Sequence, residues 1–227
     1  MSSASALLGC CECDQSQRMR VIDLSDTEAA LRQAADEIRA GRAIVYPTDT
    51  VYALGVSAIS TQGIGAAYAT KGRSEAKPLS LCVADIEQAR SYVEIDARAE
   101  KLAAAFLPGG LTLVCLSRSV LPAALQAGFP GVGIRVPGHP FGPALCKLLG
   151  HPITTTSANV SGLPPATDRA SAEAAFASAA EQPSLLIDGG PSPYAQPSTV
   201  IDLTTPEARL IREGAISFSD IQRVLAA

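Results

Sequence analysis

Residues 43–50 read Ala-Ile-Val-Tyr-Pro-Thr-Asp-Thr. A short apolar run closed by a proline, which has no backbone N–H to donate, is typical of a buried strand that ends at the proline. Small polar residues follow this strand at once. Loops that leave strand ends are where open α/β sheets bind ligands, although an ordinary Asp/Thr turn has the same composition. The segment therefore predicts a strand of the core and a candidate site beside it.

Outward from this strand, apolar runs and helical patterns continue along the chain. Helices are expected at 29–40 (with Ser25 to Glu28 as the cap), 61–71 (capped by Ser60 or Thr61 and ended by Gly72), 86–92, 96–106, 140–149, 170–180 and 217–225. Strands are expected at 43–46, 78–84, 111–116, 133–136, 153–156, 185–187, 199–202 and 210–211. Short apolar strands mixed with helices predict an α/β layer structure.

Length and composition suit one large α/β domain. The chain has 227 residues, is 47% hydrophobic, and carries Lys+Arg 18 against Asp+Glu 22, for a formal net charge of -4. No apolar run reaches the ~18 residues that a membrane span needs, so we expect a soluble protein. The acidic balance argues against a protein that coats nucleic acid, but leaves a local basic groove possible.

The cysteines and the N-terminus indicate a reducing compartment. Cys82, Cys115 and Cys146 lie singly in apolar stretches and are expected to be buried. Cys10, Cys11 and Cys13 cluster near the start, where no nearby His or Cys supplies a fourth metal ligand. Residues 1–20 are expected to be a disordered extension and 21–227 the folded domain. The extension lacks the pattern of a secretory signal, and its acidic residues do not favour a transit peptide, so the cytoplasm is the expected location.

A small group of cations stands out in this acidic chain. Residues 71–79 contain Lys71, Arg73 and Lys77 around a helix-ending glycine and a proline. Cations gathered at a bend favour a small anionic ligand. The alternative is a solvated helix end whose basic side chains interact with the helix dipole.

Further polar groups follow other predicted strands. Residues 154–162 are rich in hydroxyl and amide groups, which bring hydrogen-bond donors close to a ligand without crowding it. Arg135 lies in an apolar run, and a buried guanidinium needs a carboxylate or phosphate partner, supplied by the protein or by a ligand. Ser198 and Thr199 begin one late strand, and Arg212 ends the last one.

Residues that are missing narrow the chemistry. His139 and His151 each precede a proline, and neither has the spacing of a catalytic triad or a zinc site. There is no Walker-type phosphate loop. The sequence therefore favours reactions that run by positioning and charge neutralisation, with transfer at a phosphate as the leading kind.

Seven segments, in consistent order over about 21–224, resemble the YrdC-like family of threonylcarbamoyl-adenylate synthases. They are residues 47–55, 71–79, 106–114, 133–137, 156–162, 187–190 and 198–203. The resemblance implies a single-domain fold with an open, twisted mixed sheet, flanking helices and a concave basic site. It implies a nucleotidyltransferase that condenses L-threonine, bicarbonate or CO2, and ATP into threonylcarbamoyl-AMP and pyrophosphate. The product would serve t6A formation at position 37 of tRNA through downstream transfer machinery.

The resemblance also implies roles for individual residues. Lys71 and Arg73 would be catalytic and, with Lys77, would bind the phosphates. The residues expected to bind L-threonine are Thr50, Arg135 and Thr199. Those expected to line the nucleotide site are Ser157, Asn159, Thr167, Ser198 and Arg212. Mg2+ would accompany ATP, and no residue is expected to be a dedicated metal ligand.

Four positions depart from the pattern of the family. Cys82 stands where many longer relatives carry a His beside threonine, and Glu213 replaces the usual Pro after Arg212. Residues 165–167 and Ala53 also differ from the commoner forms. The extra C-terminal domain of longer relatives is absent, so a lid over the site is expected to come from the chain's own loops.

A second hypothesis is a non-catalytic module that binds double-stranded RNA or tRNA, because the family's concave basic surface has been linked to such RNAs. The acidic balance of the chain argues against a broad RNA footprint. A carbamoyltransferase role, as in the related domain of hydrogenase-maturation proteins, is not favoured, because the companion domains of those proteins are missing from this sequence.

Overall fold

A computed structural model describes residues 19–72 and 77–227. The elements in these residues, in chain order, are β1 (Arg20–Asp23), α1 (Thr27–Arg39), β2 (Ile44–Tyr46), β3 (Ala53–Gly55), α2 (Thr61–Lys71), β4 (Leu81–Cys82), α3 (Ile86–Arg90), α4 (Ala97–Phe106), β5 (Leu111–Leu116), α5 (Ala123–Gln126), β6 (Gly131–Arg135), α6 (Phe141–Leu149), β7 (Ile153–Thr154), β8 (Thr156–Ser157), α7 (Arg169–Phe176), β9 (Leu185–Asp188), β10 (Thr199–Asp202), β11 (Arg209–Arg212) and α8 (Phe218–Ala226).

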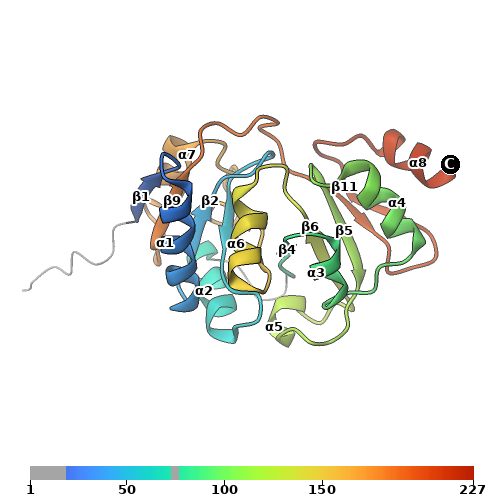
Figure 1. The fold of residues 1–227 in the computed structure, drawn as a ribbon, viewed down its shortest axis with the longest axis horizontal. Coiled ribbons are helices and arrows are strands. Elements are labelled where there is room, and N and C mark those ends of the chain that lie inside the picture. The colour runs from blue at the N-terminus through green and yellow to red at the C-terminus, as the bar shows by residue number, and fades with distance from the viewer. Residues whose placement is uncertain (1–18, 73–76) are drawn as a thin grey trace, which may run out of the picture.

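The strands form two mixed sheets that lie beside each other (Figure 1). The first has the order β1-β9-β2-β3-β8 and the second the order β11-β10-β5-β6-β4-β7. Helices α1, α2 and α7 lie around the first sheet, and α3, α4 and α8 lie around the second (Figure 1). The expected α/β fold is confirmed, with its strands divided between two sheets where the sequence indicated one.

The division occurs within the strand expected at 153–156. β7 pairs antiparallel with β4 in the second sheet, and β8 pairs antiparallel with β3 in the first. The Thr154 hydroxyl donates to Leu54 O and accepts from Val56 N, which ties the end of β7 to the first sheet. A run of small β-branched residues predicts extended backbone but does not say which neighbour it pairs with. Residues 153–157 therefore join the two sheets.

Strand β2 is buried on both faces, as its apolar run predicts. Ile44 and Tyr46 pack in one core cluster with α1 and α6, while Val45 packs in a second cluster on the opposite face. Side chains alternate along a strand, so a strand covered on both faces has no polar position. The hydroxyl of Tyr46 is satisfied by Thr154 O at 3.0 Å.

Local signals fix the ends of α2, which carries the first cation of the sequence group. The Ser60 hydroxyl accepts from Gly63 N, and Gly72 ends the helix in the left-handed conformation with φ 53°. Glycine adopts this conformation at little cost, so the stop is encoded by one residue. Among the described helices, none combines the length and the apolar character needed to cross a membrane.

Several elements differ from expectation. β1, β3 and α5 were not expected, because three or four residues are too few to show a period. β4 is limited to two residues of the expected 78–84. The prediction of disorder falls on residues 1–20, of which only 19 and 20 belong to the described part of the chain. Cys10, Cys11 and Cys13 lie outside it.

Candidate functional site

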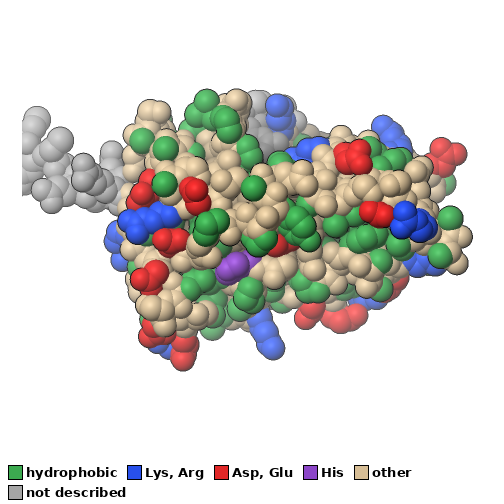
Figure 2. Space-filling view, turned by 90° about the horizontal axis from the view of Figure 1, so that it is seen from above, with side chains coloured by type: hydrophobic (Ala, Val, Ile, Leu, Met, Phe, Trp, Pro, Cys, Tyr) green, Lys and Arg blue, Asp and Glu red, His purple; other side chains and the backbone are tan. Residues whose placement is uncertain are grey.

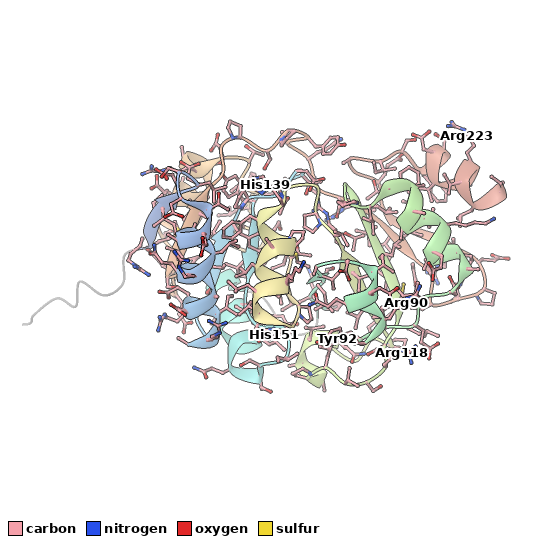
Figure 3. All side chains as sticks on the ribbon, in the orientation of Figure 1. Arg90, Tyr92, Arg118, His139, His151 and Arg223 are labelled. Atoms are coloured by element: carbon pink, nitrogen blue, oxygen red, sulfur yellow. The ribbon has the colours of Figure 1, made fainter. Side chains whose placement is uncertain are left out.

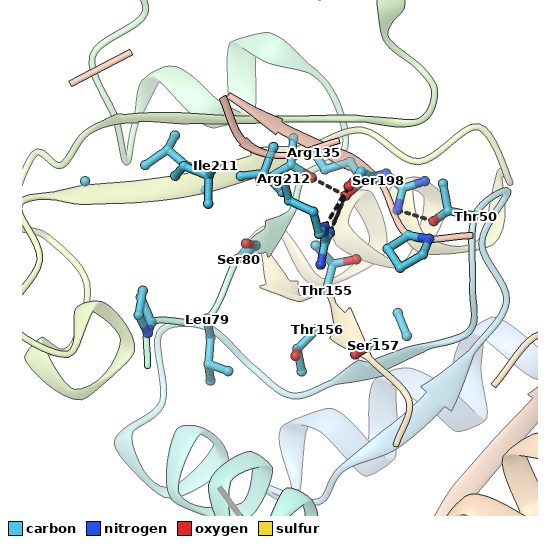
Figure 4. A pocket seen from close by; sticks show the side chains of 18 of the residues that line it. Thr50, Leu79, Ser80, Arg135, Thr155, Thr156, Ser157, Ser198, Ile211 and Arg212 are labelled. Carbon is cyan, nitrogen blue, oxygen red and sulfur yellow. Dashed lines mark hydrogen bonds between the residues drawn. The ribbon is translucent and has the colours of Figure 1, made fainter. Parts of the chain in front are cut away.

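A pocket of about 620 Å³ lies between the two sheets (Figure 4). Its floor is one face of the second sheet, lined by Thr112, Val114, Gly131 and Gly133, while their chain neighbours pack in the core. The opposite wall comes from residues 50–53 and 155–157, which are β8, the start of β3 and the chain that leads into each of these strands of the first sheet. Each wall therefore depends on a different sheet, and residues 153–157 connect them.

One end of the pocket is strongly polar. We call Thr50, Arg135, Ser198 and Arg212 the cationic corner; all four line the pocket (Figure 4). Apolar residues make up another part of the lining and include Leu79, Val114, Phe129, Val200 and Ile211. A pocket with both charged and apolar lining suits a ligand that has an anionic part and a flat or apolar part.

Arg135 is held by three hydrogen bonds at the end of β6. Its Nε donates to Gly109 O at 2.9 Å, its Nη1 to Thr50 Oγ1 at 2.6 Å, and its Nη2 to Asp49 Oδ1 at 2.5 Å. The residue is only 4% exposed, and this burial lowers the pKa of its guanidinium. A guanidinium has five N–H groups, so two remain for a ligand after these three contacts.

The Thr50 hydroxyl is oriented by its neighbours. Thr48 Oγ1 donates to Val51 O at 2.6 Å and lies 3.0 Å from Thr50 Oγ1. A hydroxyl has a single hydrogen, so the hydrogen between the two threonines comes from Thr50. Thr50 Oγ1 already accepts from Arg135, which leaves it one lone pair and makes it an acceptor toward any ligand.

Arg212 brings a second guanidinium to the pocket from β11. Its Nη2 donates to Ser198 O at 2.8 Å, and its Nε donates to the same oxygen at 3.1 Å. The Ser198 hydroxyl lies 2.8 Å from that of Thr112 on the floor. Desolvation, with a smaller contribution from the charge of Arg135, lowers the pKa of Arg212. Two arginines facing one pocket favour an anionic ligand.

Lys71 is buried behind the opposite wall, with 3% of its surface exposed. Its Nζ donates to Ser157 O, Asn159 O and Asn159 Oδ1 at 2.5, 2.9 and 3.1 Å. The Ser157 hydroxyl donates to the same amide oxygen at 2.6 Å. The C-terminal end of α2 is thereby joined to the turn after β8, which forms part of the pocket wall.

The structure places the expected site residues in three groups. Thr50, Arg135, Ser157, Ser198 and Arg212 line the pocket. Lys71 and Asn159 lie directly behind Ser157. Those outside the pocket lining are Lys77, which is exposed, Thr167, which precedes α7, and Thr199. Arg73 lies outside the described residues.

Thr199 is next to the cationic corner but completely buried. Its hydroxyl donates to Ile216 O and accepts from the backbone N–H groups of Gly214 and Ile216. These contacts use all the hydrogen-bonding capacity of the hydroxyl, and they hold the loop that precedes α8. The expected contact between Thr199 and threonine stays a prediction.

Two positions that depart from the family pattern have local partners. Cys82 lies beside Arg135 in the paired strands β4 and β6 and is fully buried, which raises the pKa of its thiol. The carboxylate of Glu213 accepts from Phe218 N at the start of α8. An acid at a helix N-terminus is favourable, so Glu213 has a partner other than Arg212.

Sequence reasoning missed several pocket residues. Thr112 lies in the apolar run of β5, and only the period of two along that strand would have separated it from its buried neighbours. Ser80 lines the pocket from the loop before β4, where no pattern marks it, and Thr155, which follows β7, was marked only as part of the polar run 154–162 (Figure 4). Asp49 was noted only as part of a turn.

Neither histidine lines the pocket. His139 and His151 are at opposite ends of α6 (Figure 3). Burial lowers the pKa of His139, whose Nδ1 accepts from Phe141 N. Within residues 19–72 and 77–227, no three His, Cys, Asp or Glu side chains come together as a group that could hold a metal ion.

Comparison with known proteins places this pocket in context. The chain is 36% identical over 199 residues to the threonylcarbamoyl-AMP synthase of Pyrococcus abyssi, an alignment that covers 87% of this chain and 58% of that protein. It is 34% identical over 207 residues to a putative threonylcarbamoyl-AMP synthase of Mycobacterium tuberculosis, covering 89% of this chain and 94% of that protein. The chain thus spans less than two thirds of the Pyrococcus protein and almost all of the Mycobacterium protein.

A solved structure shows the same fold. The crystal structure of Pyrococcus abyssi Sua5 complexed with L-threonine superposes with a TM-score of 0.85 at 34% identity, covering 91% of this chain and 60% of that one. A family model for Sua5, YciO and YrdC proteins, described as "Telomere recombination", matches residues 36–214. On this match and these identities, the chain belongs to the Sua5/YciO/YrdC family.

Proposed function

We propose that this protein is an L-threonylcarbamoyladenylate synthase, a nucleotidyltransferase that forms threonylcarbamoyl-AMP and pyrophosphate from L-threonine, bicarbonate or CO2, and ATP. The observation that carries the proposal is the cationic corner, where Arg135 keeps two N–H groups for a ligand and Arg212 faces the same pocket. Named relatives with this activity, and the likeness to a threonine-bound structure, support it.

In this proposal the substrates occupy different parts of the pocket. Arg135 pairs with the threonine carboxylate through its two remaining N–H groups, because planar guanidinium groups match carboxylates. Thr50 accepts from the threonine amine. The nitrogen lone pair then stays free for its reaction, since only an N–H is used in the hydrogen bond. Thr199 contributes through the loop that it holds.

The nucleotide lies along the remaining polar groups. Lys71, Arg73 and Lys77 are assigned to the phosphates, and Lys71 and Arg73 to the catalytic step. The other residues assigned to the nucleotide are Ser157, Asn159, Thr167, Ser198 and Arg212. The buried contacts of Lys71 with the turn at 157–159 support a second role for it, in which it shapes the wall that the nucleotide contacts.

The chemistry requires positioning and charge neutralisation more than a nucleophilic side chain. The threonine amine bonds to the carbon of CO2 and releases a proton to water. A carbamate oxygen then bonds to the α-phosphorus of ATP, and the bond from that phosphorus to the pyrophosphate oxygen breaks. Arginine and lysine side chains stabilise the charge that develops on the phosphates.

Mg2+ is proposed to enter with ATP. Magnesium commonly binds through substrate phosphates and keeps several waters, so it needs few protein ligands. The described pocket lining has hydroxyl and guanidinium groups and no acidic side chain, which fits an ion carried by the triphosphate. When bound there, the ion would neutralise phosphate charge.

The downstream partner in this proposal is the machinery that transfers the threonylcarbamoyl group to tRNA, and the location is the cytoplasm. The location rests on the sequence, in which Cys82, Cys115 and Cys146 lie singly in apolar stretches and give no sign of a disulfide framework. The face shown in Figure 2 has basic and acidic side chains interspersed, which does not favour a broad RNA-binding surface on that face.

The test is release of pyrophosphate from ATP with and without L-threonine, in the presence of bicarbonate. Threonine-dependent release is expected. Arg73→Ala should lose ATP binding and product formation, and Arg135→Ala should lose L-threonine binding and product formation. Wild-type activity in both variants would reject the residue assignment. Binding of double-stranded RNA without any turnover would reject the enzyme in favour of an RNA-binding module.

A further inference from the structure

Asp49 brings a carboxylate to the buried side of the cationic corner. Its Oδ1 accepts from Arg135 Nη2 at 2.5 Å and from Gly138 N at 2.8 Å. Asp49 is 7% exposed and is not among the residues that line the pocket. The carboxylate therefore contacts the guanidinium from behind and joins it to the loop that follows β6.

The second oxygen of Asp49 is the unusual feature. Oδ2 is buried and has no hydrogen-bond partner among the described residues. Glu37, another buried carboxylate that pairs with arginines, has both oxygens satisfied, one by Arg20 and the other by Arg42. A buried acceptor without a partner costs stability, so this arrangement differs from that of an ion pair that serves the fold alone.

Gly138 allows the carboxylate to take this position. A Cβ atom at residue 138 would lie 3.1 Å from Asp49 Cγ and 3.2 Å from Oδ2, which is tighter than ordinary van der Waals contact. The backbone at Gly138 thus approaches the carboxylate closely and donates to it from the same side. Both the strand that carries Arg135 and the loop that carries Asp49 are fixed at this contact.

We propose that Asp49 is a positioning residue, which holds the Arg135 guanidinium so that its two remaining N–H groups face the substrate carboxylate. This inference rests on the proposed function. With Gly109 O and Thr50 Oγ1, Asp49 Oδ1 provides the third fixed contact, one on each guanidinium nitrogen. A group held in its binding orientation loses less freedom on binding, which favours affinity.

Two substitutions of Asp49 distinguish the effect of its hydrogen bonds from the effect of its negative charge. Asp49→Asn keeps an oxygen that can accept from both Arg135 and Gly138, and it places the amide nitrogen where the unpaired oxygen was. Asp49→Ala removes the contact entirely. Glu37→Gln is the matched control, because it changes a buried, arginine-paired carboxylate that does not line the pocket.

The experiment measures L-threonine and ATP binding by titration calorimetry, and KM and kcat by pyrophosphate release, on the full chain. Asp49→Ala is expected to raise Kd and KM for threonine by about tenfold or more, the equivalent of one lost charged hydrogen bond. Its kcat at saturating threonine and its ATP affinity should stay within about threefold of wild type, because a change that small is less than the loss of one charged hydrogen bond. Asp49→Asn should restore threonine affinity to within the same range, and Glu37→Gln should leave it unchanged.

Two results would overturn the proposal while leaving the enzyme assignment intact. One is threonine binding by Asp49→Ala that equals wild type, and the other is binding by Asp49→Asn that is as weak as that of Asp49→Ala. If wild type itself binds no threonine, the proposed function fails, and the role of Asp49 fails with it. Should Asp49→Ala not fold, Gly138→Ala provides the same test by displacing the carboxylate, and unaltered threonine affinity in that variant counts against the proposal.

Discussion

Replacing Arg135 with lysine keeps the positive charge but changes the number of donors. The arginine has five N–H groups, and three of them are used by Gly109 O, Thr50 Oγ1 and Asp49 Oδ1. A lysine ammonium has three N–H groups in all. If it keeps the three protein contacts, none is left for a substrate, and if it turns to the substrate, protein acceptors are left unpaired.

The magnitude follows from this count. Two charge-assisted hydrogen bonds to a carboxylate are lost or exchanged, and each contributes about 1.5–3 kcal/mol. Loss of one gives at least about tenfold weaker binding, and loss of both gives about 100-fold or more. We therefore expect Arg135→Lys to raise the Kd for L-threonine by roughly 10- to 100-fold.

Titration calorimetry with L-threonine checks this expectation. Arg209→Lys is the control, because Arg209 is exposed on strand β11 of the same sheet and does not line the pocket. Thermal unfolding of both variants shows whether Arg135→Lys has altered the fold itself. If Arg135→Lys is folded and binds threonine within about threefold of wild type, the donor count is not what selects the ligand.

Three other changes test the stability of the fold. Gly133→Ala places a Cβ 2.6 Å from Ser80 Oγ, so the floor is overpacked and the free energy of unfolding should fall by about 1–3 kcal/mol, measured by denaturant titration. Hydrogen bonding to Arg42 lowers the pKa of Glu37 below its ordinary 4.5, so this carboxylate should stabilise the protein at neutral pH. That contribution should be lost as the pH falls below about 4.5, and Glu37→Gln should flatten the acid limb of a stability–pH curve; an unchanged limb would count against the pairing. Thr199→Val leaves two backbone N–H groups without their acceptor, and it should lower the free energy of unfolding by about 2–4 kcal/mol and raise hydrogen exchange in the loop before α8.

Local residues made much of the fold predictable. Ser60 and Gly72 fixed both ends of α2, because a hydroxyl cap and a left-handed glycine act within one turn of the helix. β5 and β10 have the bounds expected from their apolar runs. The division into two sheets could not be predicted, since it depends on which partner residues 153–157 choose, and pairing is set by contacts distant in the sequence.

The candidate site was predictable to the extent that its residues belong to motifs. Arg135 was marked because a charge in an apolar run needs a partner, and that partner proved to be Asp49, 86 residues away. Thr199 lies in a motif too, yet the contacts of its hydroxyl with the loop before α8 depend on how the late strands pair. The sequence pattern marks a polar residue at a strand end but does not say which way its side chain turns.

The order of strands within the two sheets has a consequence for synthesis of the protein. β9 lies between β1 and β2 in the first sheet, although it follows them by some 140 residues or more, and β10 lies between β5 and β11 in the second. The ribosome adds about 5–20 residues per second, so β1 and β2 wait several seconds for the strand that joins them. Chains released before Leu185 should therefore lack the strand that joins β1 to the rest of the first sheet, and they also lack Ser198 and Arg212 of the cationic corner. The binding site is completed only when most of the chain has left the ribosome.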